Sequence, residues 1–437
     1  MYPPHLDHSV DIAIIGAGAA GLFAGIWAGR TLQQQPGGTS ARIIAFDGAK
    51  KLGAKILVAG GGRCNVTHHA VDEQQYAGSS RNAIRKVLRR FDVPRTIEFF
   101  QQLGVTLKRE DTGKLFPTTD DAHTVLDALL AAAHHAHLHL QHPWRVSAIH
   151  RSESGFVISG PDDPSAAAPA PTVTARRIIL ATGGMALPKT GSDGAGYRFA
   201  KALGHTMTPR IFPALVPLTM PSDHWICRLS GITLQTTLEL RASTTKRLTS
   251  FTNSTLLTHF GLSGPGPLDI SRYLAAAKHE DPGAGLFINW LPGSTRELID
   301  ADLLALGKIS PGRYLRECGL PDRLVDGICA AARVDPSMHG HALTRDARRE
   351  LVRLIVETEA PISGDRGFTH AEVTAGGIPL AEIHLDTMES RLCPGLHLCG
   401  EVCDVDGRIG GFNFQWAWAS GFIAGSAAAT ALAGPTA

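Results

Sequence analysis

A glycine-rich turn near the start of the chain constrains its fold more than any other stretch. Residues 11–29 read DIAIIGAGAAGLFAGIWAG, an apolar run, a G-x-G-x-x-G turn at 16–21 and an Ala-rich segment. This order predicts a buried strand, a tight turn and a helix, the start of a βαβ unit. In such a turn Gly16 permits the bend, Gly18 lets the backbone approach a pyrophosphate, and Gly21 lets helix and strand pack closely. The stretch therefore predicts a dinucleotide site, with phosphate at the positive end of the helix dipole.

An acidic residue follows the second predicted strand. That strand covers residues 42–46 and ends at Asp47. A carboxylate at this position accepts hydrogen bonds from an adenosine ribose, and the polar segment 33–40 explains its extra distance from the glycines. An acid here favours FAD or NAD over NADP, which carries a ribose phosphate. The alternative is a solvated aspartate in a turn.

The second glycine-rich stretch, GGGRCN at 60–65, lacks the strand and helix of another nucleotide turn. Three successive glycines let backbone lie flat against a ligand, and a flavin ring is the natural candidate. Arg63 would balance the charge of the pyrophosphate or the reduced flavin, and Asn65 would hydrogen-bond the ring. Cys64 has no partner cysteine nearby, so a small packed residue is the alternative to a redox role.

Two later segments repeat the pattern of a strand that runs into glycine. A predicted strand at 172–180 leads into ATGG, and a predicted strand at 395–400 leads into EVCDVDGRIGG and a helix at 412–425. Asp404 would hold ribityl hydroxyls, and amides at 411–413 would stabilise negative charge on the reduced ring. A capped core helix is the alternative for this last segment.

These segments supply a full set of predicted cofactor-binding residues. They are Gly16, Ala17, Gly18, Ala19, Ala20, Gly21, Asp47, Gly60, Gly61, Gly62, Arg63, Cys64, Asn65, Val146, Ala181, Thr182, Gly183, Gly184, Gly400, Glu401, Asp404, Gly411, Phe412, Asn413 and Gln415. No catalytic residue is assigned, although Tyr197, His370 and Arg408 are candidates for a proton or carbonyl partner. No metal site is predicted, because the histidines between 134 and 142 lie along a helix end and a strand without a nearby carboxylate.

Composition limits the kinds of partner and the cellular setting that we expect for the chain. The net charge of +2 gives no basic field for nucleic acid, so we expect no nucleic-acid partner. The seven cysteines include no C-x-x-C pair, which favours a reducing cytoplasm over a disulfide framework or a zinc site. The first ten residues do not resemble a secretory signal, and the turn explains the apolar run at 12–29 better than a membrane span does. A monomer is compatible with the sequence, which leaves the oligomeric state open.

The composition and the predicted secondary structure change at residue 209. A Pro-rich segment there is followed by alternating strand patterns and then by a mainly helical region at 294–357. We therefore expect a cofactor domain at 1–208 and 366–437, interrupted at 209–365 by an inserted domain. Within the insertion, GLSGPGP at 261–267 is interpreted as a rigid corner rather than a phosphate loop.

The chain resembles a known family, the BaiN-like flavoproteins labelled NAD(P)/FAD-dependent oxidoreductases. The resemblance rests on AIIGAGAAG at 13–21, GAKILVAGGGRCNVT at 53–67, GKLFPTTDDAHTVLDAL at 113–129, THFGLSGPGPLDIS at 258–271, AEVTAGGI at 371–378 and GEVCDVDGRIGGFNFQWAWASGFIAG at 400–425. It implies an α/β fold, a GR2-type FAD-binding Rossmann-like domain with a β-meander, interrupted by an inserted β-barrel-like plus helical domain. The sequence departs from the family at Asp47, where glutamate is usual, at Cys399 and Cys403, in a segment that is usually apolar, and at GPGP, where GPA is commoner.

The resemblance also implies an activity. It implies tightly bound FAD in a bacterial cytoplasmic protein and flavin-dependent reduction of an apolar enone or dienone, the family's described activity being on 3-oxo bile-acid dienes. NAD(P)H is the expected transient donor, because no second nucleotide turn is present. Two alternatives remain: a dehydrogenase or oxidase that desaturates its substrate, and a flavin-binding redox sensor or RNA-associated module without turnover.

Overall fold

The structure, a computed structural model, describes residues 9–35, 41–161 and 170–432. Most of the polar segment predicted at 33–40 lies outside these ranges. The chain divides into two compact units. Unit 1 runs up to Pro213 and resumes at Val373, and unit 2 spans Ala214–Glu372. The sequence places the same two borders a few residues earlier, at 209 and 366.

Unit 1 is organised around a sheet that carries the first glycine turn. Its strands are β1 (Ser9–Ile15), β2 (Ile43–Phe46), β7 (Leu138–Gln141), β10 (Thr172–Leu180), β20 (Ile383–His384), β21 (Glu389–Ser390) and β22 (Leu396–Leu398). Their order is β20-β21-β22-β10-β1-β2-β7, and β22, β10, β1, β2 and β7 run parallel. Parallel strands are covered on both faces, which explains why Ile12–Ile15 form an unbroken buried apolar run.

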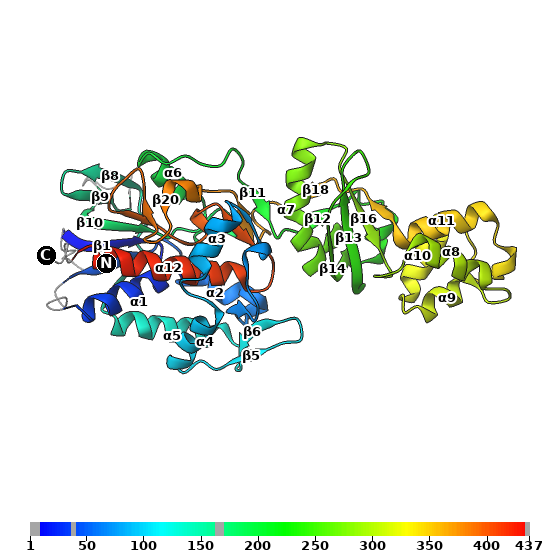
Figure 1. The fold of residues 1–437 in the computed structure, drawn as a ribbon, viewed down its shortest axis with the longest axis horizontal. Coiled ribbons are helices and arrows are strands. Elements are labelled where there is room, and N and C mark those ends of the chain that lie inside the picture. Colours follow the sequence, from blue (N-terminus) through cyan, green and yellow to red (C-terminus); the bar gives the residue numbers. More distant parts are fainter. Residues whose placement is uncertain (1–8, 36–40, 162–169, 433–437) are drawn as a thin grey trace. The chain divides into compact units, whose positions relative to one another are not determined.

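Two long helices, α1 (Ala19–Gln33) and α12 (Phe412–Thr430), pack directly on each other. Figure 1 shows them side by side, blue and red. A Cβ atom at Gly425 would lie 2.0 Å from the carbonyl oxygen of Ala24, and one at Gly421 would lie 2.7 Å from that of Ala20. The glycines of the C-terminal helix therefore allow backbone-to-backbone packing, which brings the last segment of unit 1 against the first turn.

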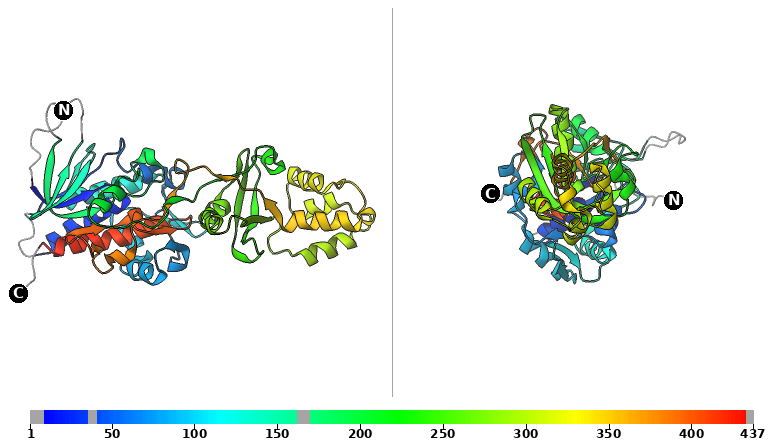
Figure 2. Two further views of the ribbon diagram at one scale, coloured as in Figure 1. Left: turned by 90° about the horizontal axis from the view of Figure 1, so that it is seen from above. Right: turned by 90° about the vertical axis from the view of Figure 1, so that its right-hand side faces the viewer.

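A meander branches from β10 and is visible as the teal strands in Figure 2. β8 (Ala148–Ser152) pairs with β9 (Gly155–Ser159), which pairs with β10. β8 begins at Ala148, so Trp144 precedes the meander and is not part of it. Trp144 is held elsewhere, because its amide donates to the Asp47 carbonyl and its ring packs 4.4 Å from that of Phe46.

Shorter elements complete unit 1. The helices are α2 (Ala54–Val58), α3 (Arg81–Leu88), α4 (Val93–Gln102), α5 (Ala122–His135) and α6 (Ala195–Ala202). The strands are β3 (Thr67–His68), β4 (Tyr76–Gly78), β5 (Leu107–Arg109), β6 (Lys114–Pro117), β11 (Phe212–Ala214), β19 (Val373–Ala375) and β23 (Val405–Gly407). β4 pairs with β23, which places the start of α3 beside the segment that precedes α12.

Unit 2 combines an antiparallel sheet with a group of helices. The strands are β12 (Leu218–Thr219), β13 (Thr233–Arg241), β14 (Arg247–Thr258), β15 (Gly261–Ser263), β16 (Gly285–Asn289), β17 (Thr358–Ala360) and β18 (Gly364–Asp365), in the order β17-β16-β13-β14-β15-β12-β18. The helices are α7 (Pro265–Glu280), α8 (Arg296–Ala305), α9 (Pro311–Glu317), α10 (Asp322–Ala332) and α11 (Arg345–Val356). The GPGP segment opens α7, with Gly264 at the N-cap and Pro265 in the first turn, so proline starts a helix here.

The described residues offer neither a membrane-spanning helix nor a cluster of metal ligands. None of the described helices combines the length and the apolar character needed to cross a membrane. Across the same residues, no three or more His, Cys, Asp or Glu side chains gather as a potential metal site.

Candidate functional site

The three glycines in the turn between β1 and α1 have different structural roles. Gly16 has φ +99°, and a Cβ there would lie 2.6 Å from the carbonyl oxygen of Ala181. A Cβ at Gly21 would lie 1.8 Å from the Gly16 carbonyl oxygen, whereas one at Gly18 would meet nothing within 4 Å. Gly16 and Gly21 are therefore required by packing. Gly18 caps α1 without a side-chain hydrogen bond, so its backbone and the first-turn amides remain open to a phosphate.

Asp47 lies beside this turn, at the end of β2. Its Oδ2 accepts a hydrogen bond from the amide of Ala17 at 2.7 Å, and its Oδ1 accepts one from the amide of Ala49 at 2.8 Å. A carboxylate has about four acceptor positions, so these two bonds leave capacity for ribose hydroxyls. The ribose contact stays a prediction, and the structure adds that Asp47 also fixes the turn.

The GGGRCN segment forms a tight turn after α2. Gly60, Gly61 and Gly62 have φ values of +59°, +70° and +87°, and a Cβ at Gly61 would meet nothing within 4 Å. The Arg63 guanidinium lies 2.6 Å from Glu110 Oε1 and 4.0 Å from the Phe116 ring centre. The charge of Arg63 is therefore compensated by protein, and the predicted pairing with a cofactor has no separate support in these contacts.

The next two residues are buried. Burial raises the pKa of the Cys64 thiol to about 12, so the thiol stays protonated at neutral pH, which favours the packed residue over the redox role. Asn65 is 7% exposed, and its Oδ1 has no hydrogen-bond partner among the described residues. An unsatisfied buried acceptor costs about 1–3 kcal/mol, so this oxygen is positioned to accept a bond from a ligand donor.

Glu401, in the turn after β22, joins three segments. Its Oε2 lies 2.6 Å from Lys55 Nζ on α2, and its Oε1 accepts the amide of Thr374 at 3.0 Å. A Cβ at Gly184, just after β10, would lie 2.8 Å from Glu401 Oε1. Sequence reasoning missed Lys55, whose only signal is its place in the GAKILVAGGGRCNVT motif.

Asp404 and Tyr197 lie deeper in the same region. Asp404 is 8% exposed, and its Oδ2 accepts the hydroxyl of Ser79 at 3.1 Å. The Tyr197 hydroxyl is buried and has no partner in the described structure. Burial first, and then the negative charges of Glu401 and Asp404, raise the pKa of Tyr197, so it stays a neutral phenol.

The two other candidate proton partners differ from Tyr197. His370 belongs to unit 2, where its Nδ1 contacts the carbonyl of Arg366 at 3.2 Å. Arg408 donates its backbone amide to the carbonyl of Gln75. Tyr197 lies near Glu401 and Asp404, and Arg408 directly follows Gly407, which Asn413 bonds, so both lie beside predicted cofactor residues.

The start of α12 is fixed by its own side chains. Gly411 has φ +93° at the N-cap, and Asn413 bonds both the amide and the carbonyl of Gly407. The Trp416 indole donates a hydrogen bond to the carbonyl of Gly400, and the Ser420 hydroxyl accepts one from the amide of Gly400. The helix therefore positions the turn that carries Glu401.

Gln415, a predicted cofactor residue, forms several hydrogen bonds with protein groups. Its Oε1 accepts the hydroxyls of Thr67 and Thr96 at 2.6 and 3.0 Å, and its Nε2 donates to the carbonyl of Phe91 at 2.8 Å. The side chain is 1% exposed, and three of its four hydrogen-bonding positions are taken by protein groups. These contacts give Gln415 a structural role, and its cofactor contact stays a prediction.

Most of the predicted residues gather at one edge of the sheet. The first turn, Asp47, the ATGG turn and the Gly400–Glu401 turn all follow parallel neighbours, whose carboxyl ends meet at the same edge. Lys55 and Trp418 tie the GGGRCN segment to this edge, since the Trp418 indole donates to the carbonyl of Val66. Val146 is 7% exposed and lies just before β8. Ligands of open α/β sheets bind at this end of the strands.

Comparison with known proteins adds a family and several relatives. A family model described as "HI0933-like protein Rossmann domain" matches residues 10–427. A 3-dehydro-bile acid delta(4,6)-reductase of Clostridium scindens is 33% identical over 96% of this chain and 98% of its own length. Ribosomal RNA dihydrouridine synthases of Escherichia coli and Haemophilus influenzae are 31% and 30% identical, each over 94% of this chain and 96% of its own length.

A solved structure supports the fold. E. coli quinol fumarate reductase FrdA matches with a TM-score of 0.50 at 15% sequence identity, covering 98% of this chain and 71% of that one. At this identity the likeness concerns architecture alone. It agrees with a Rossmann-type FAD-binding domain interrupted by an insertion, the fold class predicted from the sequence.

Proposed function

The chain belongs to the family of HI0933-like proteins, as the motif resemblance predicts, and from this premise we propose that it is an FAD-dependent oxidoreductase that saturates a carbonyl-activated C=C bond. NAD(P)H is the proposed electron donor. The overall reaction adds a hydride from the donor to one carbon and a proton to the other, and leaves the oxidised nicotinamide.

One observation carries the cofactor assignment. The open backbone at Gly18 and Gly61 and the unpartnered Oδ1 of buried Asn65 all belong to segments joined at the carboxyl edge of the sheet. An extended dinucleotide needs close backbone approach at its phosphates and an acceptor for a ring N–H. The residues present therefore fit FAD.

The names of the relatives share one type of reaction. A delta(4,6)-reductase acting on a 3-dehydro-bile acid and a synthase of dihydrouridine both saturate a C=C bond. In a 3-oxo-4-ene and in the uracil ring alike, a carbonyl conjugated with that bond draws electrons from it. This shared chemistry supports an enone-type substrate and favours reduction over desaturation.

The residues of the chain have distinct tasks in this proposal. FAD, when bound, supplies hydride transfer between donor and substrate. The first-turn amides of α1 hold the diphosphate, Asp47 accepts ribose hydroxyls, and Asp404 accepts ribityl hydroxyls. The Lys55–Glu401 pair fixes the turn beside the ATGG segment, and the neutral Tyr197 phenol can donate a proton or hydrogen bond at the site.

The test is anaerobic reduction of the purified flavoprotein by NADH and by NADPH, followed by reoxidation with a panel of acceptors. The panel contains a 3-oxo-4-ene steroid, its 4,6-diene, a ribosomal RNA fragment with uridine and a saturated ketone as control. We expect bleaching by a nicotinamide and recovery only with conjugated acceptors. In a parallel aerobic assay without nicotinamide, oxygen consumption with the saturated ketone would instead support the desaturating dehydrogenase or oxidase.

A second substrate class has a specific observation in its favour. Two relatives that each align with 94% of this chain are named as ribosomal RNA dihydrouridine synthases. A uridine base in RNA is therefore the second candidate substrate beside an apolar enone. The acceptor panel separates them, because a uridine reductase leaves the steroid unreduced and converts the RNA fragment.

A further inference from the structure

A run of positive charge lies on α3 and the two residues that follow it. Residues 81–90 read RNAIRKVLRR and contain five basic residues and no acidic one. Ile84, Val87 and Leu88 are buried, so the apolar side of the helix is used by the core. We call the opposite side the basic face, and it consists of Arg81, Arg85, Lys86, Arg89 and Arg90.

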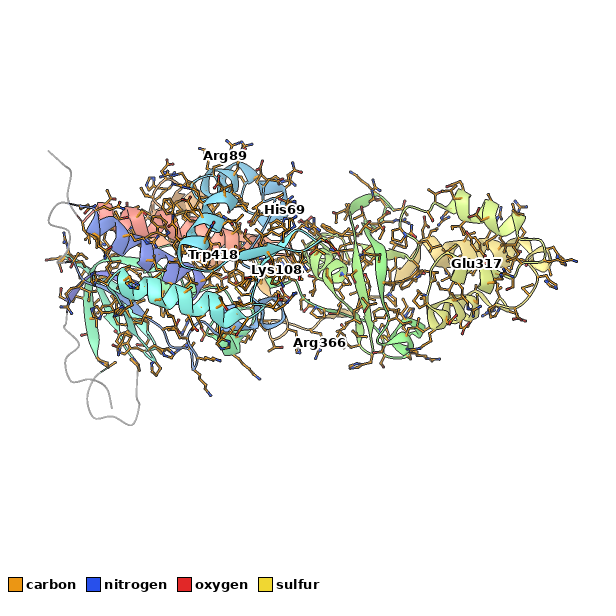
Figure 3. All side chains as sticks on the ribbon, turned by 90° about the horizontal axis from the view of Figure 1, so that it is seen from below. His69, Arg89, Lys108, Glu317, Arg366 and Trp418 are labelled. Atoms are coloured by element: carbon orange, nitrogen blue, oxygen red, sulfur yellow. The ribbon has the colours of Figure 1, made fainter. Side chains whose placement is uncertain are left out.

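Most of this charge is not neutralised by the protein. Arg85 lies 3.5 Å from Glu73, and Arg90 lies 3.4 Å from Asp386, whose side chain is 91% exposed. Within the described residues, Arg81, Lys86 and Arg89 are exposed and form no ion pair. Figure 3 shows Arg89 projecting outward, whereas Trp418 lies inside unit 1. The net charge of +2 for the whole chain conceals this local field.

The helix begins beside the candidate site. Ser80 caps α3, and the preceding Ser79 donates its hydroxyl to Asp404, a predicted cofactor contact. The helix has eight residues and extends about 12 Å from that point at 1.5 Å per residue. A chain of phosphates following the basic face would therefore lead toward the cofactor residues.

A surface hollow adjoins the far end of the basic face. It has a volume of about 570 Å³ and lies between Arg90, the loop residues Asp386 and Thr387, and the side of α12 from Phe422 to Ala431. The Arg95 guanidinium lies 5.4 Å from the Phe422 ring centre at this surface.

We propose that the basic face of α3 binds the phosphate backbone of a structured RNA. Charge complementarity carries this proposal, because Arg81, Lys86 and Arg89 are exposed, form no ion pair among the described residues and belong to a segment that begins beside Asp404. It reverses the expectation that net charge alone suggests. A membrane surface fits less well, because interfacial helices need an apolar side free to enter lipid and that side of α3 is buried in the core. The proposal goes beyond the reductase function, since the RNA can bind here whichever class of bond is reduced.

The experiment measures binding of the FAD-loaded protein to a fluorescently labelled RNA hairpin by anisotropy, at KCl concentrations from 50 to 300 mM. The test variant combines Arg81→Gln, Lys86→Gln and Arg89→Gln. The control combines Lys308→Gln, Arg345→Gln and Arg349→Gln, which removes the same charge from exposed positions of unit 2. Flavin absorbance and thermal unfolding verify that both variants fold.

We expect the α3 variant to bind at least about tenfold more weakly at 100 mM KCl. The slope of log K against log salt should fall in magnitude by about 2.7, or about 0.9 for each lost phosphate contact, whereas the control keeps the wild-type slope. Equal loss in both variants, or no RNA binding by the wild type, would overturn the proposal. Binding to vesicles with anionic lipid that is lost in the α3 variant, while RNA binding persists, would assign the face to membranes instead. Because no electron donor or enone is present, these outcomes are independent of the reductase test.

Discussion

Lys55 Nζ lies 2.6 Å from Glu401 Oε2, and this ion pair connects the helix before the GGGRCN turn to the turn after β22. The two residues are 346 positions apart in sequence, yet both side chains are largely buried, at 27% and 16% exposed. The second bond of Glu401, to the Thr374 amide, adds β19 to the same junction. One carboxylate thus holds together segments from both parts of unit 1.

Lys55→Gln should destabilise the protein by about 1–3 kcal/mol, because Glu401 is left partly buried without its cation. Urea unfolding of the apoprotein measures the loss. Lys51→Gln removes the same charge from an exposed neighbour and should change stability by less than about 0.5 kcal/mol. Equal effects of the two substitutions would show that the ion pair does not stabilise the junction.

Gly18→Val should impair cofactor binding, whereas Gly21→Ala should impair folding. The Gly18 position has open space and φ −77°, so the valine variant should fold with a normal melting temperature and lose its flavin absorbance. A Cβ at Gly21 would lie 1.8 Å from the Gly16 carbonyl oxygen, so the alanine variant should lose about 3 kcal/mol or more. Full yellow absorbance in the Gly18 variant would refute the phosphate assignment.

Asp47→Ala should weaken FAD binding, since it removes charge-assisted hydrogen bonds worth about 1.5–3 kcal/mol each, or roughly 10- to 150-fold in affinity. It also frees the amide of Ala17, which Asp47 now holds at 2.7 Å. Calorimetric titration of the apoprotein with FAD gives the change. Asp47→Asn keeps one acceptor and should fall between the alanine variant and the wild type, and unchanged affinity in both would remove Asp47 from the site.

The cysteines should differ sharply in reactivity. Burial raises the pKa of Cys64 to about 12, whereas Cys318 is exposed. Since the thiolate is the reactive form, an alkylating agent at pH 8 should modify Cys318 quickly and leave Cys64 intact until the protein unfolds. Peptide mass spectrometry over time distinguishes the two. Rapid modification of Cys64 in the folded protein would reopen its redox role.

The sequence predicts the parts of this site that depend on local backbone chemistry. The turn at Gly16–Gly21 and the acid at Asp47 follow from patterns a few residues long, in which glycine and strand ends have fixed meanings. The partner of Glu401 and the structural role of Gln415 depend instead on contacts across more than 300 residues. No local pattern distinguishes a ligand-facing amide from one that bonds buried threonines. The net charge of the chain also does not reveal a local basic surface, because a sum over all residues cannot locate the basic face of α3.

Asn65 offers the sharpest separation of binding from folding. Its Oδ1 is buried without a partner among the described residues, and an unsatisfied buried acceptor costs about 1–3 kcal/mol, so Asn65→Ala should leave the unfolding free energy of the apoprotein unchanged or raise it. The same substitution should speed FAD dissociation, because the acceptor for the ring is lost. Asn413→Ala is the matched control: its amide already bonds Gly407 twice, so it should destabilise the apoprotein. Urea unfolding and the rate of flavin release, measured on both variants, give the comparison. If Asn65→Ala retained FAD as the wild type does, the orphaned oxygen would face no cofactor, and the flavin ring would have to lie elsewhere along the carboxyl edge of the sheet.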